Sequence, residues 1–419
     1  MSGVVVTGVG VVSAFGVGAR AFFQGLAEGR AAVGPIRSFD ARAFPVRVAG
    51  EVPDAPDIVI EGVRDRKASF GVAAAREAWR GAGCGAPERG AALVVAVGLE
   101  QALLPDFAPL MRDGRIDWTG AGAARESAGA PAEPAAPPAR FRAPIDQAVR
   151  VLADQLGLRG PIIAHVSACA AGTLAVTHAA ALIERGEIDV ALAGAFDSMV
   201  NPLGIGGMAR LGAPSPRDEP DACRPFDRRR DGLAIGEGAA MFVLERAERA
   251  RARGAPALAR ILGWGSTQDG YRVTMPRPDG RQAARAMSLA LARARLPPEA
   301  IGYVNAHGTG TPLNDPAEAR AIHLALGAHG ARVPVSSIKG AVGHLMAASG
   351  AIEIAACLLP FSHGLLPGTA HHQEPDPACA LQVIGPRPVA VPVEVVLSNS
   401  FGFGGQNATI VLGRGAGPA

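Results

Sequence analysis

The segment Pro161-Ile162-Ile163-Ala164-His165-Val166-Ser167-Ala168-Cys169-Ala170-Ala171-Gly172 decides the fold of this chain. Its apolar first half follows Gly160 and predicts a buried strand. Residues Thr173–Arg185 are apolar almost all round and end at Gly186, which predicts a buried helix with a glycine stop. Cys169 therefore lies at a tight strand-to-helix junction.

Two interpretations of Cys169 are open at this point. The positive end of the helix lowers the pKa of a thiol and leaves backbone N–H groups free to bind an oxyanion, which favours a nucleophile. A buried structural cysteine among small residues is the alternative, because cysteine is among the most buried residue types. The motifs further along the chain favour the nucleophile.

Length and composition describe a soluble globular protein. The chain has 419 residues, 48% of them hydrophobic and 19% charged, which suggests two domains or one large duplicated domain. Lysine plus arginine number 41 against 38 acidic residues, a net charge of +3 that argues against a nucleic-acid or membrane-surface partner. The lysines among them are Lys67 and Lys339 alone.

Cysteine usage and hydropathy indicate a reducing, cytoplasmic location. The five cysteines are scattered, no pair has metal-ligand spacing, and a chain of this size needs no disulfide framework, so we expect free thiols and no metal. The apolar N-terminus Met1–Val12 lacks a basic region and is interrupted by glycines, which predicts a first strand and not a signal peptide. No uninterrupted 18-residue apolar run predicts a membrane span.

The first glycine motif, Val4-Val5-Val6-Thr7-Gly8-Val9-Gly10, is a partial match to a dinucleotide fingerprint. Ser13 stands where the third glycine would be, so we interpret the motif as a structural turn and reject nucleotide binding. Residues Gly120–Pro138 are rich in Ala, Pro and Gly and predict a loop or flap, and Asn201–Asp231 is also loop-like.

The order of elements repeats along the chain, with the best boundary at Gly254-Ala255-Pro256. We expect two duplicated halves, residues 1–254 and 255–419, in α/β layers with buried, mainly parallel strands at the centre. Three segments of the first half each match one of the second: Val4–Gly10 matches Leu258–Gly263, Ala91–Gly98 matches Ile301–Val304, and Pro161–Val166 matches Pro334–Ile338. The segments Asp189–Ala195 and Ala239–Leu244 of the first half match Glu394–Leu397 and Thr409–Leu412 of the second. Chemistry is expected at strand ends where the halves meet.

Two histidine motifs follow predicted strands of the second half. Asn305-Ala306-His307-Gly308-Thr309-Gly310-Thr311-Pro312 offers an imidazole beside glycines that let a ligand approach and threonines that can hydrogen-bond an amide-bearing ligand. A loop histidine with a structural hydrogen bond is the alternative. Lys339-Gly340-Ala341-Val342-Gly343-His344 lies within two positions of where the duplication would put Cys169, although chance also explains the lysine. Glu353, in an apolar helix beyond, needs a partner, and Lys339 is the obvious candidate.

The last glycine-rich loop is Ser400-Phe401-Gly402-Phe403-Gly404-Gly405. Phe403 could supply a backbone N–H and an aromatic gate, or be one packed aromatic in a tight hairpin turn. Taken together, Cys169, His307 and His344 describe a thiolate nucleophile and two imidazoles able to stabilise negative charge on a thioester carbonyl.

With these motifs the chain resembles the β-ketoacyl-acyl-carrier-protein synthases of the thiolase superfamily, in the elongating Cys-His-His branch. The resemblance runs from the Val4 motif to Phe401-Gly402-Phe403-Gly404-Gly405-Gln406-Asn407, and Arg224-Pro225-Phe226-Asp227 with Gly236-Glu237-Gly238 also fits the family pattern. It implies a five-layered αβαβα sandwich from two duplicated halves, usually a homodimer, acting with acyl carrier protein in fatty-acid or polyketide synthesis and without a cofactor.

The resemblance also implies residue roles. Cys169 would accept the acyl group, His307 and His344 would promote decarboxylation of a malonyl thioester, and the N–H groups of Cys169 and Phe403 would hold the oxyanion. The supporting residues implied are Lys339 and Glu353 to order the site, Thr309 and Thr311 for pantetheine, and Arg66, Lys67 and Arg210 for the acidic carrier. Gly120–Pro138 departs in composition from housekeeping members, in a region that in relatives helps shape the acyl pocket and dimer. Two single residues also depart from the family pattern: Ala347 replaces a common glycine and Gln406 a common threonine.

Competing interpretations are weaker. A thiolase would need a second cysteine in the last glycine-rich loop, and an initiating synthase would have asparagine at His344. A non-catalytic chain-length partner usually lacks the nucleophile, although a heterodimer with this chain as catalytic member is open. A Cys-His protease is disfavoured by the duplication.

Overall fold

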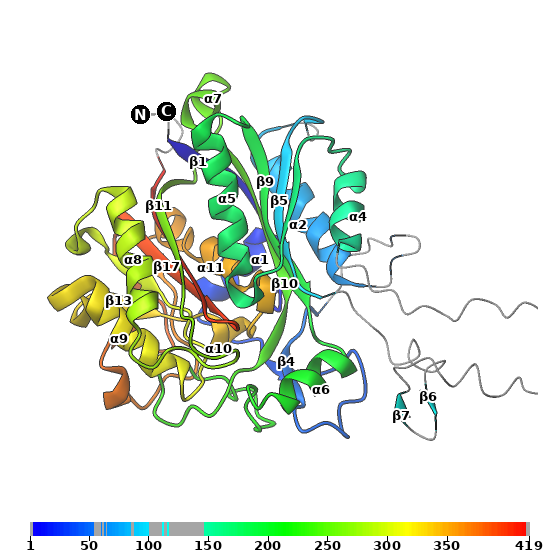
Figure 1. Cartoon of the computed structure of the whole chain (residues 1–419), viewed down its shortest axis with the longest axis vertical. Coiled ribbons are helices and arrows are strands. Elements are labelled where there is room, and N and C mark those ends of the chain that lie inside the picture. The colour runs from blue at the N-terminus through cyan, green and yellow to red at the C-terminus, as the bar shows by residue number, and fades with distance from the viewer. Residues whose placement is uncertain are drawn as a thin grey trace, which may run out of the picture.

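The computed structural model describes residues 3–53, 60, 63, 65–84, 88–99 and 146–415, together with the backbone of two short strands at 111–112 and 115–116. The principal strands belong to one continuous 14-stranded sheet, whose two halves form two layers that alternate with three layers of helices, and the five layers run side by side across Figure 1. The predicted αβαβα sandwich is confirmed.

The first half of the chain forms one sheet and its helices. Its principal strands lie in the order β8-β5-β9-β10-β1. The bounds are β1 Val4–Ser13, α1 Ala19–Ala27, α2 Lys67–Gly81, β5 Ala92–Val97, α4 Gln147–Gln155, β8 Ile162–His165, α5 Ala171–Arg185, β9 Val190–Ser198, α6 Pro202–Arg210, β10 Ile235–Arg246 and α7 Ala247–Ala252.

The second half repeats this order as β13-β12-β17-β18-β11. The bounds are β11 Ala259–Gln268, α8 Arg281–Ala294, β12 Tyr303–Asn305, α9 Asn314–Leu326, β13 Pro334–Ser336, α10 Lys339–Val342, α11 Ser349–Ala356, α12 Leu359–His363, β17 Val395–Gly402 and β18 Gln406–Arg414. Short strands complete the fold: β2 Gly16–Val17, β3 Gly34–Pro35, β4 Val48–Gly50, β6 Met111–Arg112, β7 Arg115–Ile116, β14 Leu365–Leu366, β15 Gln382–Val383 and β16 Val389–Ala390.

The duplication is visible where the two halves meet. β1 and β11 pair antiparallel, with Val4 opposite Ile261, so the two sheets join edge to edge. Each strand has a register shift at the same place, before Gly8 in β1 and before Gly263 in β11. The close packing of a helix on each strand explains the glycines: a Cβ on Gly10 would lie 1.9 Å from the Ala74 carbonyl oxygen of α2. The Val4–Gly10 motif is thus a packing motif inside strand β1, and the structural turn expected there is wrong.

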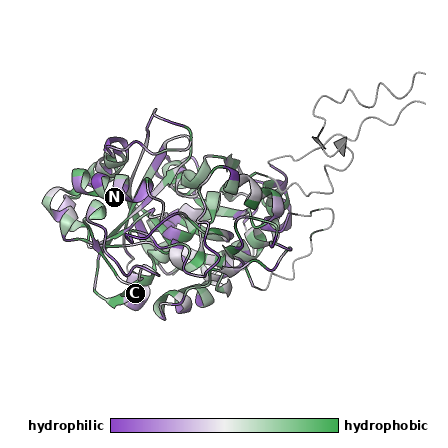
Figure 2. Ribbon diagram, turned by 90° about the horizontal axis from the view of Figure 1, so that it is seen from below, coloured by the Kyte–Doolittle hydropathy of each residue, from purple (hydrophilic) through white to green (hydrophobic). Residues whose placement is uncertain are grey.

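Helices α5 and α11 form the middle layer, between the two sheets. They begin side by side, because a Cβ on Gly172 would lie 2.6 Å from the Ala351 nitrogen and one on Gly350 would lie 2.6 Å from the Thr173 nitrogen. The outer layers are α2 with α4 and α8 with α9. Figure 2 shows both green and purple residues on the peripheral helices, as expected for helices that bury one side.

Strand direction corrects one prediction. The inner pairs β1/β10, β9/β10, β11/β18 and β17/β18 are antiparallel. Among the principal strands, parallel pairs lie further out, such as β5 with β8 and β12 with β13, and the short strand β4 pairs parallel with β10. The expectation of mainly parallel central strands is therefore wrong. The β10 and β18 strands return beside β1 and β11, and a returning strand pairs antiparallel.

Two further expectations, about the Cys169 strand and about the segment Asn201–Asp231, are wrong. The Cys169 strand β8 is a sheet edge and not a buried strand, with Ile162 47% and Val166 49% exposed. The supposed loop Asn201–Asp231 contains α6, capped by the Asn201 side chain, which accepts from the Gly204 N–H. Residues Gly120–Pro138 lie outside the described residues.

One apolar stretch, Met346–His363, is long and apolar enough to cross a membrane by composition, but 83% of it is buried inside the fold. It includes α11 and α12, and its apolar side chains pack in the hydrophobic core.

Candidate active site

Cys169 lies in a 3₁₀ turn, Ala168–Ala170, between β8 and α5. Ala168 has φ +46°, a left-handed conformation that a residue with a side chain adopts only under constraint. The thiol is free and 8% exposed. The strand-to-helix junction predicted from the sequence is thus a strained turn that presents the sulfur from the start of α5.

The end of β17 reaches this turn. A Cβ on Gly402 would lie 3.1 Å from the Cys169 nitrogen, and the neighbouring Phe403 backbone is close enough to lower the pKa of the Cys169 thiol, against the larger effect of burial. The Cys169 turn and the Phe403 loop therefore lie side by side at the sulfur, and the oxyanion role of their N–H groups stays a prediction.

His344 is held in one tautomer. Its backbone N–H donates to the Ala234 carbonyl at 2.7 Å, which fixes the loop against β10. Its Nδ1 accepts from the Met346 N–H at 3.0 Å and lies 2.9 Å from Ser349 Oγ. A backbone N–H can only donate, so Nδ1 is the unprotonated nitrogen and the ring proton is on Nε2.

His307 is fixed by its own buried partners. Its backbone N–H and that of Gly308 donate to the two carboxylate oxygens of Glu318, each at 2.8 Å. Lys339 Nζ lies 3.3 Å from His307 Nδ1 and donates to the His307 carbonyl at 2.6 Å. The ammonium faces Nδ1, so the ring proton of His307 is also on Nε2.

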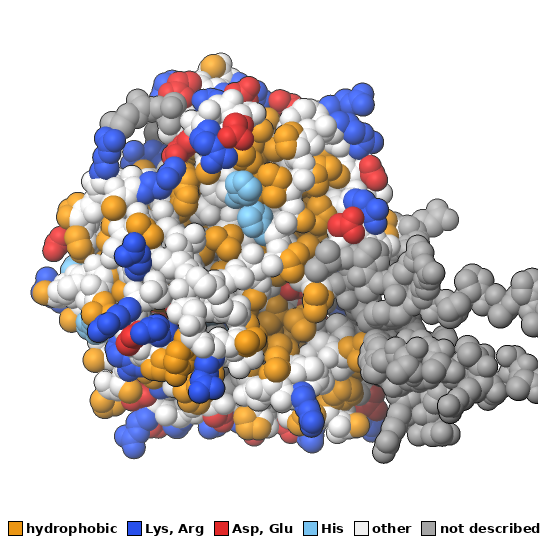
Figure 3. Space-filling model, in the orientation of Figure 1, with side chains coloured by type: hydrophobic (Ala, Val, Ile, Leu, Met, Phe, Trp, Pro, Cys, Tyr) orange, Lys and Arg blue, Asp and Glu red, His pale blue; other side chains and the backbone are white. Residues whose placement is uncertain are grey.

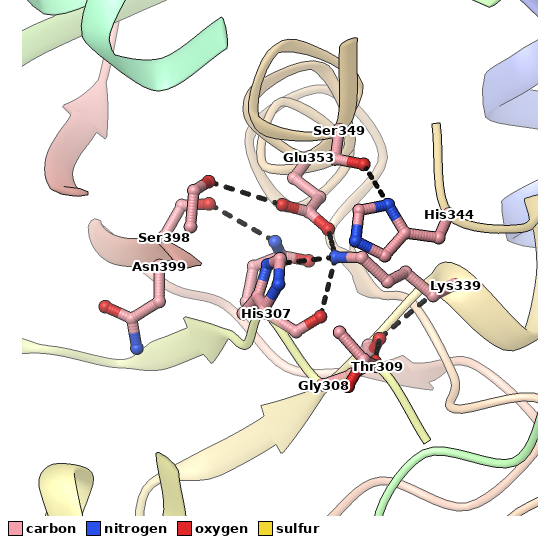
Figure 4. A network of polar contacts seen from close by, with 12 residues as sticks. His307, Gly308, Thr309, Lys339, His344, Ser349, Glu353, Ser398 and Asn399 are labelled. Carbon is pink, nitrogen blue, oxygen red and sulfur yellow. Dashed lines mark hydrogen bonds and ion pairs between the residues drawn. The ribbon is translucent and has the colours of Figure 1, made fainter. Parts of the chain in front are cut away.

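Lys339 and Glu353 form the buried ion pair expected from the sequence. Figure 4 shows the Lys339 ammonium between Glu353 and His307. The His344 ring lies on the opposite side of the ammonium from His307, and the Ser349 hydroxyl contacts that ring. The rings of His307 and His344 meet edge to face, with centroids 5.4 Å apart, and the Phe401 ring lies 5.6 Å from His307. Phe401 precedes Gly402 on β17, so Cys169 and both histidines lie around the same strand end.

Burial sets the protonation states. Desolvation lowers the pKa of both His307 and His344 well below the ordinary value, and the nearby Lys339 ammonium lowers them further. Desolvation also raises the pKa of Glu353 to about 7, against the attraction of Lys339. The two imidazoles are therefore neutral at physiological pH and act as hydrogen-bond donors through Nε2.

The expected lowering of the thiol pKa is wrong. Burial raises the pKa of Cys169 to about 11, and the opposing effects of Lys339 and the Phe403 N–H are smaller. The sequence showed the helix N-terminus but not the exclusion of water from the sulfur.

The duplicated counterpart of Cys169 also differs from the prediction. Met346 has φ +48° in a second 3₁₀ turn, Met346–Ala348, which precedes α11 as Ala168–Ala170 precedes α5. Cys169 therefore matches Ala347 and not a residue near Lys339. The short helix α10, which carries Lys339, is an insertion that the first half does not have.

Thr309 and Thr311 lie in the loop between β12 and α9, with their hydroxyl oxygens 2.9 Å apart. Buried Asp315 accepts from the N–H groups of Thr309 and Gly310 and holds the loop. Asp315, Glu318 and Ser349 were not predicted from the sequence. The acids Asp315 and Glu318, in the helix that follows the histidine motif, could have indicated side chains that hold this loop. The pantetheine role of the threonines stays a prediction.

The carrier-docking prediction is wrong for Lys67. Its side chain is fully buried, with Nζ 2.8 Å from Asp65 and donating to the Leu99 carbonyl at 2.6 Å. Arg66 faces inward as well, 3.1 Å from the buried Glu237 carboxylate, while Arg210 is exposed at the end of α6. The two adjacent cations neutralise the protein's own carboxylates, which spacing alone does not reveal.

Comparison with known proteins gives a consistent result. The family model "Beta-ketoacyl synthase, N-terminal domain" matches residues 1–250, and "Beta-ketoacyl synthase, C-terminal domain" matches residues 258–373. The chain is 36% identical to 3-oxoacyl-[acyl-carrier-protein] synthase 2 of Coxiella burnetii, covering 98% of both chains. It is 39% identical to the oxytetracycline polyketide putative beta-ketoacyl synthase 1 of Streptomyces rimosus, covering 98% of this chain and 96% of the relative.

A solved structure agrees with these relatives. The ishigamide ketosynthase/chain length factor superposes with a TM-score of 0.83 at 35% identity, covering 98% of this chain and 99% of the other. Sequence, fold and the Cys-His-His geometry thus lead to one conclusion: this chain belongs to the beta-ketoacyl synthase family of condensing enzymes.

Proposed function

We propose that this chain is the catalytic ketosynthase that transfers an acyl group from acyl carrier protein to Cys169 and condenses it with a malonyl thioester. One observation carries the proposal: the end of β17 packs against the Cys169 turn, where a Cβ on Gly402 would lie 3.1 Å from the Cys169 nitrogen, while the neutral rings of His307 and His344 meet edge to face beside Phe401 of the same strand.

Acyl transfer comes first. The Cys169 sulfur forms a bond to the thioester carbonyl carbon, the carrier's sulfur leaves, and the thiol proton ends on the carrier's sulfur. Because burial raises the pKa of Cys169 to about 11, the proton is lost as the substrate binds and reacts, and not beforehand. The N–H groups of Cys169 and Phe403 hold the negative oxygen of the tetrahedral intermediate.

Condensation follows on the same sulfur. The malonyl carboxylate leaves as carbon dioxide, and the electron pair of the broken bond forms the enolate of the thioester, whose oxygen takes hydrogen bonds from Nε2–H of His307 and His344. The enolate carbon then attacks the acyl carbonyl, and the bond to Cys169 breaks. The released thiolate takes up a proton from water, and because no step changes an oxidation state, the proposed reaction needs no redox cofactor.

We infer the partners of the reaction from the names of the relatives and from the exposed edge strand β8. The Coxiella relative is named for acyl carrier protein, and the ishigamide neighbour pairs a ketosynthase with a chain length factor. The exposed Ile162 and Val166 at strand β8 support a dimer that continues the sheet across this edge. We expect a homodimer in the cytoplasm, with the heterodimer as alternative, in fatty-acid or type II polyketide synthesis.

Intact-protein mass spectrometry after incubation with carrier proteins bearing acyl groups of different lengths tests the function. One acyl mass should be added to the wild type and to Cys84→Ala, a half-buried cysteine elsewhere, and none to Cys169→Ala. Acylation of Cys169→Ala would refute the assignment. Light scattering of the isolated chain distinguishes a homodimer from a monomer that needs a different subunit to form the heterodimer. In the mass spectrometry experiment, the acyl length that loads best indicates the pathway.

A further inference from the structure

Asp197 is a buried carboxylate near the end of strand β9 that the proposed reaction does not use directly. In the view of Figure 3 most acidic side chains (red) lie near the rim of the molecule, where water solvates them. Asp197 is 1% exposed, and a buried charge is stable only when hydrogen bonds and opposite charges compensate for the lost water. The partners of this carboxylate therefore indicate its role.

The Asp197 carboxylate accepts hydrogen bonds from two backbone N–H groups. The Ala347 N–H donates to Oδ2 at 2.9 Å, and the Ser198 N–H donates to Oδ1 at 2.8 Å. Gly98 leaves room for the carboxylate, because a Cβ there would lie 2.3 Å from both carboxylate oxygens. Burial raises the pKa of Asp197 to about 6, against the attraction of the buried Lys67 ammonium and the Ala347 N–H. At pH 8 the carboxylate is thus ionised and can only accept hydrogen bonds.

The duplication assigns Asp197 a counterpart in the second half. Leu192 of β9 and Leu397 of β17 lie at matching places relative to the register shifts of β1 and β11. Counting along both strands from these leucines matches Asp197 with Gly402. Two equivalent strand positions therefore carry a carboxylate in one half and no side chain in the other.

These two matched residues contact matched turns. Gly402 lies at the Cys169 turn, where a Cβ on it would be 3.1 Å from the Cys169 nitrogen. Asp197 lies at the turn Met346–Ala348 and binds the N–H of Ala347, the counterpart of Cys169. The protein's own carboxylate thus binds the N–H that corresponds to the one at which a substrate oxyanion is expected in the first half.

The turn that Asp197 binds also holds His344. Met346, the residue before Ala347, donates its N–H to Nδ1 of His344 at 3.0 Å, and Ser349 Oγ lies 2.9 Å from the same nitrogen. Successive N–H groups of one turn therefore bind Asp197 and His344. A movement of Ala347 away from Asp197 would move the Met346 N–H away from the imidazole.

We propose that Asp197 is a positioning residue for the condensation step, which anchors the Met346–Ala348 turn and through it holds His344 in the orientation that donates from Nε2. The inference rests on the proposed function and deepens it. Loading of Cys169 does not use His344 in the proposed reaction, whereas decarboxylation does. Comparison of these two steps therefore separates positioning of the imidazole from a general effect on the fold.

The test measures both steps in the full-length protein at pH 8. Loading of Cys169 is followed by intact mass with the octanoyl thioester of N-acetylcysteamine. Decarboxylation is followed by carbon dioxide release from malonyl carried on a bacterial fatty-acid acyl carrier protein.

Asp197→Ala should release carbon dioxide about 10-fold more slowly than the wild type, because a displaced hydrogen-bond donor stabilises the enolate less. It should load Cys169 at least as fast as the wild type, since burial raises the pKa of this thiol and the Asp197 charge adds to that effect. Asp197→Asn, which keeps one acceptor oxygen, should release carbon dioxide at a rate between the two. Asp189→Ala, at an exposed aspartate just before β9, is the matched control and should behave as the wild type in both steps.

The double variant Asp197→Ala/His344→Ala gives a measurement that a merely structural role would not produce. If Asp197 acts through His344, the double variant should release carbon dioxide no more slowly than His344→Ala alone. A further loss of about 10-fold on top of the His344→Ala loss would show that Asp197 acts elsewhere, and would overturn the inference.

The remaining outcomes separate this inference from the proposed function. If the wild type lacks either activity, the proposed function fails. If the wild type has both and Asp197→Ala keeps the wild-type decarboxylation rate, or loses both steps equally, the positioning inference is wrong while the function stands. Should Asp197→Ala unfold, Asp197→Asn decides: slower carbon dioxide release with wild-type loading supports the inference, and any other result overturns it.

Discussion

The Met346 N–H donates to Nδ1 of His344 at 3.0 Å, and this single contact fixes which nitrogen of the ring carries the proton. Met346 can reach this position because its backbone is in the left-handed region, φ +48°, in the turn that starts α11. The tautomer of His344 thus depends on the duplicated fold, since the same turn in the first half presents Cys169.

His307→Ala and His344→Ala should each lower the rate of malonyl decarboxylation about 100-fold or more, because each removes one donor to the enolate oxygen. Acyl loading of Cys169, measured by intact mass, should persist in both variants. His363→Ala, an exposed histidine of α12, is the control and should release carbon dioxide at the wild-type rate. Unchanged carbon dioxide release in either active-site variant would refute that histidine's role.

The pH profile of decarboxylation should not show the titration of an ordinary histidine. Both imidazoles have pKa values well below the ordinary 6.5, so they keep their neutral, donating form as the pH falls through 6.5. In Glu318→Gln/Glu353→Gln, which removes the two neighbouring buried carboxyls whose pKa values are raised to about 7, we expect the rate of carbon dioxide release to stay level from pH 8 down to about pH 6. A half-loss of rate centred on pH 6.5 would contradict this protonation state.

Lys339→Met should destabilise the protein by about 3 kcal/mol, measured by urea unfolding, because it leaves the buried Glu353 without its cation. The double variant Lys339→Met/Glu353→Gln should recover part of this loss. Arg185→Met, which breaks the exposed pair with Glu187, should leave the free energy of unfolding close to that of the wild type, because solvent screens this pair. Equal effects of the buried and the exposed substitution would show that the ion pair is not structural.

Gly10→Ala should destabilise the fold by about 3 kcal/mol or more, because its Cβ would lie 1.9 Å from the Ala74 carbonyl oxygen. Gly34→Ala is the matched control, since a Cβ there meets nothing within 4 Å. Thermal unfolding of both variants checks the prediction. A tolerated Gly10→Ala would mean that β1 and α2 are further apart than the packing requires.

The sequence by itself determined the local features. The Cys169 junction, the helix end at Gly186, and the glycine loops around His307 and Phe403 follow from short-range rules about turns, caps and apolar runs. The matching order of elements also predicted the duplication. These features depend on neighbours in the chain, so the sequence displays them directly.

Only the tertiary structure decided what depends on burial and on distant partners. It moved Lys67 into the interior, raised the pKa of Cys169 where its helix position alone indicated a lower one, and brought Glu318 under His307. It also placed Ala347 opposite Cys169, because α10 is inserted before the second turn. Desolvation and long-range packing set these properties, and neither is visible until strands far apart in the chain lie side by side.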